Sequence, residues 1–171
     1  MTRTSNARAA GVATLIYIAA GFASLALARN APAAAVLALI GSFSALVLAV
    51  TLYAITREQD PDLARLGMLC RVIEAAPGHG EIYFAVGSTI FSWLLLRGRM
   101  IPAGLAWLGV TASALLVMLL PLQIAGWFGG PRAWSSPVTW SVWLPLLVFE
   151  LTLAAWLIVR GVAMPALRQP A

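Results

Sequence analysis

Long apolar stretches separated by short polar segments dominate this chain. Residues 30–56 and 100–131 contain no charged residue at all, over lengths that can cross roughly 30 Å of hydrocarbon. The same pattern predicts five membrane-crossing helices, at about residues 10–28, 33–55, 82–96, 102–124 and 138–159. We therefore expect an all-α fold, a polytopic transmembrane helix bundle that forms one domain over residues 1–171.

The segment 62–76 has two interpretations. It contains apolar residues at helical spacing but also Arg65, Arg71 and Glu74, so it is either a sixth span or an amphipathic helix on the membrane surface. At about fifteen residues, or roughly 22 Å, it is short for a spanning helix. The residues Asp60, Pro61 and Asp62 are typical of a helix start.

The arginines favour the sixth span. If 62–76 crosses and the N-terminus is inside, Arg29 and Arg132 are outside, Arg71 is in the membrane, and every other arginine is inside. If it does not cross, the arginines divide almost evenly, against the usual excess of basic residues on the cytoplasmic side. We therefore predict six spans with a short third helix and with the N- and C-termini cytoplasmic.

Composition supports the membrane class. Of 171 residues, 61% are hydrophobic and 10% charged, with a mean hydropathy of +0.91, whereas about a quarter of an ordinary soluble domain is charged. We expect a multi-pass protein of the bacterial inner membrane, with the lipid bilayer as its first partner. The net charge of +5 comes from arginines scattered singly between apolar runs, so no nucleic acid is expected as a partner.

Charged side chains at membrane depth mark the candidate site. Because such groups are costly in lipid, they face a bundle interior or water. Arg71 and Glu74 are three residues apart on one helix face and can pair directly. The candidate ligand-binding residues are Arg71, Glu74, His79, Glu81 and Glu150. They converge on one site if the third, fourth and sixth helices are neighbours.

Three roles stay open for these residues: helix packing, ligand binding or catalysis, and a path for protons or ions. Glu74 and Glu150 are the catalytic candidates, as proton donors in an apolar site. We expect no metal, since the chain has one histidine and no ligand-spacing motif. We expect no cofactor either, because no nucleotide-binding or haem-attachment motif is present.

Three stretches carry a family resemblance: 71–75 (RVIEA), 94–109 (LLLRGRMIPAGLAWLG) and 149–162 (FELTLAAWLIVRGV). In order and spacing they resemble the bacterial membrane proteins of domain-of-unknown-function family 4386. The resemblance implies a six-helix membrane bundle, no established activity, and Arg71, Glu74 and Glu150 as the matching polar residues within the membrane. This chain departs from the family in the shortened segment 77–81.

Two functions from different classes follow. The first is a non-enzymatic membrane protein that binds a lipophilic small molecule or serves as an accessory subunit of a larger membrane complex. The small residues of the first two helices also allow a homo-oligomer. The alternative is a membrane-embedded enzyme, a proton-initiated cyclase or isomerase acting on a prenyl or lipid-like substrate with Glu74 or Glu150 as the acid. A transporter is disfavoured because no inverted repeat is visible.

Overall fold

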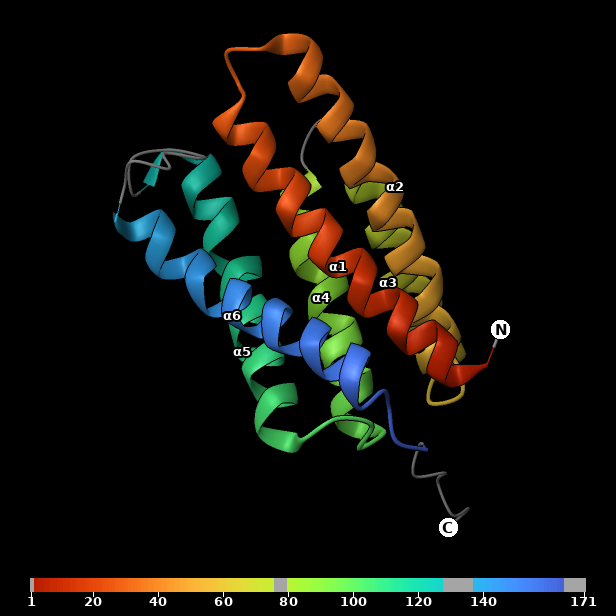
Figure 1. Cartoon of the computed structure of the whole chain (residues 1–171). Helices are drawn as coiled ribbons and strands as arrows, with labels where there is room; N and C mark the ends of the chain where they lie inside the picture. Colours follow the sequence, from red (N-terminus) through yellow and green to blue (C-terminus); the bar gives the residue numbers. More distant parts are fainter. Residues whose placement is uncertain (1, 76–79, 128–136, 165–171) are drawn as a thin grey trace.

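A computed structural model describes residues 2–75, 80–127 and 137–164 of the chain (Figure 1). The described residues form helices and no strand. In chain order the helices are α1 (Arg3–Ala26), α2 (Ala31–Thr56), α3 (Pro61–Glu74), α4 (Gly80–Arg97), α5 (Ala103–Ile124) and α6 (Pro137–Val159). The all-α prediction is confirmed for this part of the chain.

Four of these helices, α1, α2, α5 and α6, are long and apolar enough to cross a membrane. Their outward faces are also apolar. On α2 the exposed large side chains are Val36, Leu39, Ile40, Phe43, Leu46, Val47 and Val50. A soluble protein rarely exposes so continuous an apolar surface. The chain is therefore a membrane protein, as its composition predicts.

The predicted helix boundaries agree with the structure except at the first helix. We predicted a start near residue 10, but α1 begins at Arg3, after Thr2 caps it by accepting a hydrogen bond from the Ser5 N–H. Ala7 and Ala10 are fully buried in this first part of the helix. The prediction was wrong because it treated the segment that contains Arg3 and Arg8 as a flank outside the helix. In the structure this segment is already helical, and one of its faces is packed against the bundle.

The third helix starts where the sequence predicts. Asp60 caps α3 by accepting a hydrogen bond from the Leu63 N–H at 3.1 Å, and Pro61 is the first helical residue. The helix spans 14 residues, which confirms that it is short. Asp62 and Arg65 are exposed near its start. Further along, its exposed side chains are apolar, with Leu66, Leu69, Val72 and Ile73 between 39% and 52% exposed.

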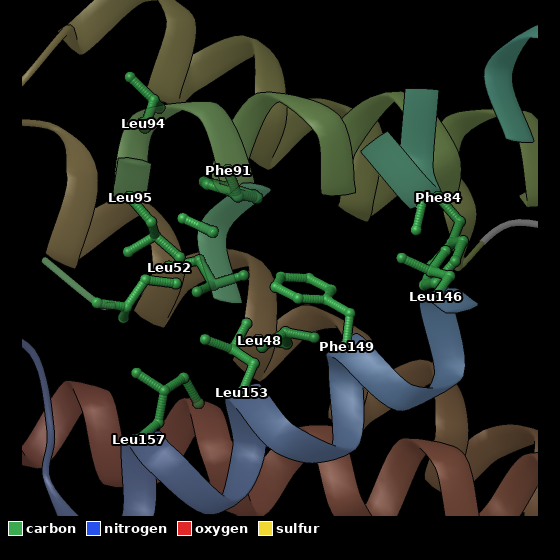
Figure 2. Packing of buried hydrophobic residues seen from close by; sticks show 14 of the residues in the cluster. Leu48, Leu52, Phe84, Phe91, Leu94, Leu95, Leu146, Phe149, Leu153 and Leu157 are labelled. Atoms are coloured by element: carbon green, nitrogen blue, oxygen red, sulfur yellow. The ribbon is translucent and has the colours of Figure 1, made fainter. Parts of the chain in front are cut away.

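The helices form a closed ring. Each packs against its neighbours in the chain, and α6 returns to pack against α1 (Figure 1). Leucines and phenylalanines of α2, α4 and α6 point into the ring and meet there, as Figure 2 shows for Leu48, Leu52, Phe91, Leu95, Phe149, Leu153 and Leu157. Side chains from α4 and α6 therefore meet inside the ring.

One end of the ring is tied together by contacts between helix ends, and we call it the basal end. There Arg3 Nη2 donates to the Ile55 carbonyl oxygen at 2.8 Å, which joins α1 to α2. Arg97 lies 3.8 Å from Asp60, which joins α4 to α3. The Ala163 N–H donates to the Met100 carbonyl oxygen at 3.0 Å and fixes the chain after α6. The opposite end, near the α1–α2 turn, we call the cavity end.

Candidate functional site

Arg71 lies inside the bundle, on the inner face of α3, with 2% of its side chain exposed. Gly87 of α4 makes room for it. A Cβ at Gly87 would lie 3.3 Å from both Arg71 Cγ and Cys70 Cβ, closer than most real contacts. The missing side chain at Gly87 thus lets α3 approach α4 with an arginine between them.

Arg71 organises a polar cluster that we define as Arg71, Glu74, Ser88 and Glu150. Its Nη1 donates to Glu74 Oε2 at 3.1 Å, and its Nη2 donates to Glu150 Oε1 at 3.1 Å and to Ser88 Oγ at 2.9 Å. The Ser88 hydroxyl lies 3.3 Å from Glu150 Oε1 and donates to it. The predicted Arg71–Glu74 pair is confirmed, and α3, α4 and α6 meet at this cluster.

The polar cluster holds two carboxylates for one guanidinium. Glu74 is buried, with 4% of its side chain exposed, and Glu150 has 8%. Glu74 Oε1 is buried and has no well-formed hydrogen bond among the described residues, and the Tyr17 hydroxyl beside this carboxylate acts as a weak donor to it. A buried carboxylate oxygen without a strong donor is energetically costly, so a further donor or a cation near this carboxylate would stabilise the cluster.

Three aromatic rings stand beside the cluster. Arg71 Cζ lies 4.5 Å from the centroid of the Phe84 ring, within the range of a cation–π contact. Tyr17 and Trp143 both stack on Phe84, with centroid distances of 6.4 Å and 5.9 Å. We call Tyr17, Phe84 and Trp143 the aromatic wall. It places one ring from each of α1, α4 and α6 next to the buried charges.

A cavity of about 460 Å³ opens at the cavity end, in front of the aromatic wall. Most of its lining is apolar and comes from α1, α2 and α6. Its acidic lining residues are Glu74, Glu81 and Glu150. Arg71 is absent from the lining, since it lies behind the two carboxylates it binds. The cavity thus has mainly apolar walls, and we call its three acidic lining residues the acidic floor.

Helix divergence creates this cavity. Near the basal end α1 touches α6 closely, because a Cβ at Gly11 would lie 2.7 Å from the Ala154 carbonyl oxygen. Ten residues later in α1, a Cβ at Gly21 would have nothing within 4 Å, and the same holds for Gly41 of α2. In Figure 1, α6 leans away from α1 toward the cavity end. The space between them is what the cavity occupies.

The structure therefore brings together most of the predicted site residues. Glu74, Glu81 and Glu150 line the cavity, and Arg71 holds two of them from behind. His79 lies outside the described residues. Within the part of the chain that the structure describes, no group of three or more His, Cys, Asp or Glu side chains is arranged to hold a metal ion.

Sequence reasoning missed Ser88 and the aromatic wall. Phe84 and Ser88 are four residues apart in α4, so they share a helix face with each other. A serine on the inner face of an apolar helix, next to Gly87, was the available signal for a polar partner. Nothing in the spacing of Tyr17 and Trp143 indicated that they would stack on Phe84, because that depends on how α1 and α6 cross.

No protein-family model, curated protein or solved structure matches this chain. The resemblance to domain-of-unknown-function family 4386 therefore stays a prediction from three sequence segments. The function has to be inferred from the cavity and the polar cluster themselves.

Proposed function

We propose that the chain crosses the bacterial inner membrane six times, with both termini in the cytoplasm. The arginines support this topology, because those at the basal end are Arg3, Arg8, Arg57, Arg65, Arg97, Arg99 and Arg160, with Arg29 at the opposite end. The face of α3 supports it too. A surface helix would turn its charges to water along its whole length. α3 exposes Asp62 and Arg65 near its basal end, but further along it buries Arg71 and Glu74 and exposes leucine, valine and isoleucine.

A pair of C-terminal reporter fusions tests this topology. Fused after Ala171, a reporter that is active only in the cytoplasm should give signal, and one that is active only outside should give none. The reverse result would place the C-terminus outside and would contradict the proposed topology.

We propose further that the protein binds a lipophilic small molecule in the cavity at the cavity end. The main evidence for this proposal is the cavity itself. Its volume of about 460 Å³ falls in the range of ligand sites, roughly 300–1,000 Å³, which combine mainly apolar walls with a few polar groups. Helix divergence, rather than a missing side chain, produces this space, so it is a feature of the fold.

The rim of the cavity supports entry from the bilayer. Phe22 and Leu25 of α1 line the cavity and are 45% and 53% exposed, and Trp140 and Leu144 of α6 line it and are 42% and 51% exposed. These side chains belong at once to the cavity and to the apolar outer surface. A lipophilic molecule that moves laterally in the membrane can therefore reach the acidic floor without crossing water.

Native mass spectrometry of gently extracted protein tests the proposal, with two matched glycine variants. Gly21→Phe places a ring in the cavity and narrows it, whereas Gly104→Phe places the same ring in open space at the start of α5, near the basal end. We expect the wild type and Gly104→Phe to carry a small lipophile and Gly21→Phe to lose it. A wild type that is empty in mild detergents and nanodiscs would refute the proposal. A stoichiometric second polypeptide on a protein with an empty cavity would indicate the accessory-subunit role instead.

A further inference from the structure

We infer that the cavity takes a lipophilic organic cation, whose charge lies against Glu74 and whose apolar body fills the space between α1, α2 and α6. This inference rests on the proposed function and gives the ligand a chemical class. Four observations lead to it: the charge balance of the polar cluster, the Glu74 oxygen that Arg71 does not bind, the aromatic wall, and the position of Arg71.

The charge balance comes first. Glu74 and Glu150 both line the cavity, and when both carboxyl groups are ionised the one arginine that binds them leaves an excess of one negative charge. Glu81 also lines the cavity and interacts with another part of the chain, so its charge is left out of this balance. None of the described lining residues is basic. A buried excess charge is costly in an apolar site unless an opposite charge joins it or a carboxyl group takes up a proton, and a bound cation supplies the first of these.

Glu74 Oε1 gives the position of that opposite charge. Its partner oxygen, Oε2, is held by Arg71 at 3.1 Å, whereas Oε1 has no hydrogen bond from the described residues. Glu74 also lines the cavity. A cationic group in the cavity beside Glu74 would attract this carboxylate and leave the Arg71 pair intact.

The aromatic wall suits the same ligand. Tyr17, Phe84 and Trp143 all line the cavity beside Glu74, and their rings are within 21° of parallel in each stacked pair. Aromatic faces attract organic cations, and sites for quaternary ammonium groups commonly combine several rings. Carboxylate and rings together therefore favour a cation with an apolar periphery over a neutral lipophile.

Arg71 does not reverse this preference. Both of its terminal nitrogens already donate to carboxylates or to Ser88, and the Phe84 ring covers its guanidinium. Its Nε has no partner among the described residues, but Arg71 does not line the cavity. A ligand anion in the cavity would meet Glu74 and Glu150 before it reached the arginine. The site therefore disfavours anions of the same shape.

Three probes test the inference in phosphatidylcholine nanodiscs, with protein-free nanodiscs as the partition blank. They are tetraphenylphosphonium, the anion tetraphenylborate of similar shape, and the neutral triphenylphosphine oxide. Binding is read by equilibrium dialysis and by quenching of tryptophan fluorescence. We expect tetraphenylphosphonium to bind at least tenfold more tightly than the neutral probe, and the borate to show no saturable binding.

Two variants locate the charge. Glu74→Gln keeps an acceptor for Arg71 and removes the excess charge, so it should weaken tetraphenylphosphonium at least tenfold and leave the neutral probe unchanged. Retained binding of the neutral probe also shows that this variant is folded. Glu58→Gln, the same substitution on an exposed side chain at the basal end, should change neither probe.

A second position keeps the test independent of Arg71. Ser42 of α2 lines the cavity, and Ser42→Lys adds a positive charge there, whereas Ser42→Gln adds a neutral polar side chain. We expect Ser42→Lys alone to abolish tetraphenylphosphonium binding. Equal affinity for cation and neutral probe, or no effect of Glu74→Gln and Ser42→Lys, would overturn the cation inference while the proposed function stood. If no probe binds and native spectra show an empty cavity, the proposed function fails as well.

Discussion

The two halves of α1 pack in opposite ways. Near the basal end the helix touches α6 so closely that Gly11 has no room for a Cβ, whereas near the cavity end Gly21 faces open space. Both halves have the same kind of sequence, rich in alanine and glycine. Small residues therefore allow close approach but do not enforce it. The crossing of α1 and α6 decides which half is packed and which half is hollow.

The two ends also use charge differently. At the basal end Arg3 and Glu58 form an ion pair in which Glu58 is 53% exposed. Between the ends, the polar cluster holds its charges at 2% to 8% exposure. Exposed pairs contribute little to stability, but a buried pair is costly to break because it leaves a charge without a partner. Four predictions test these contrasts in packing and in charge, from the largest expected effect to the smallest.

Removing Arg71 should have the largest effect. Arg71→Ala leaves Glu74 and Glu150 buried together without a cation, and we expect a loss of about 3–5 kcal/mol in the free energy of unfolding. The measurement is thermal unfolding followed by a thiol-reactive dye, since Cys70 is buried and is the one cysteine of the chain. Arg65→Ala, which removes an exposed arginine of the same helix, should change stability by less than about 0.5 kcal/mol. Equal effects would show that the polar cluster contributes no more than a surface pair.

The two glycines of α1 should respond with opposite signs. Gly11→Ala pushes a methyl group against the Ala154 carbonyl oxygen and the Ile158 side chain, and we expect a loss of about 1–3 kcal/mol. Gly21→Ala meets no atom and should gain roughly 0.5–1 kcal/mol from helix propensity. Titration with a denaturing detergent in mixed micelles compares them. A destabilised Gly21→Ala would mean that α1 and α6 close together at the cavity end.

Two phenylalanines of α4 separate packing from ligand binding. Both belong to the buried hydrophobic cluster (Figure 2), but Phe84 also lines the cavity as part of the aromatic wall, whereas Phe91 is not among the lining residues. Both Phe→Leu changes should cost about 1 kcal/mol of stability. Phe84→Leu alone should weaken tetraphenylphosphonium, by about threefold to tenfold in equilibrium dialysis, because it removes a ring from the cavity. If Phe91→Leu weakens binding as much, the wall has no specific role.

The exposed pair at the basal end should have the smallest effect. Glu58→Gln removes its charge, and we expect a loss of under about 1 kcal/mol that shrinks further at high salt. The same detergent titration at low and high ionic strength measures this loss. A loss as large as that of Arg71→Ala would show that the basal end depends on this pair.

Much of the fold could be predicted from the sequence, because helix length and hydrophobicity are local properties. The short α3 and its start at Asp60 and Pro61 follow from residues that are adjacent in the chain. The start of α1 could not be predicted in this way, since only packing against α2 shows why the charged segment at its beginning is helical.

The site was predictable only in part. Arg71 and Glu74 pair within one helix turn, so spacing alone predicts their contact. The contact of Arg71 with Glu150 depends on the order of helices in the ring, which periodicity does not encode. The cavity was harder still to predict from the sequence, because it arises from the angle between α1 and α6. That Glu81 lines it together with Glu74 and Glu150 is visible only in the structure.

The contact between Arg71 and Glu150 links residues that are 79 positions apart, and α6 follows the other described helices in the chain. While the ribosome is still producing the earlier helices, Arg71 has only the neighbouring Glu74 and α4 to balance its charge. In the proposed six-span topology, a short helix with such a charge gains little from entering lipid alone. We therefore expect α3 to settle in the membrane late, once α6 has been delivered, so that its insertion waits for a helix made after it.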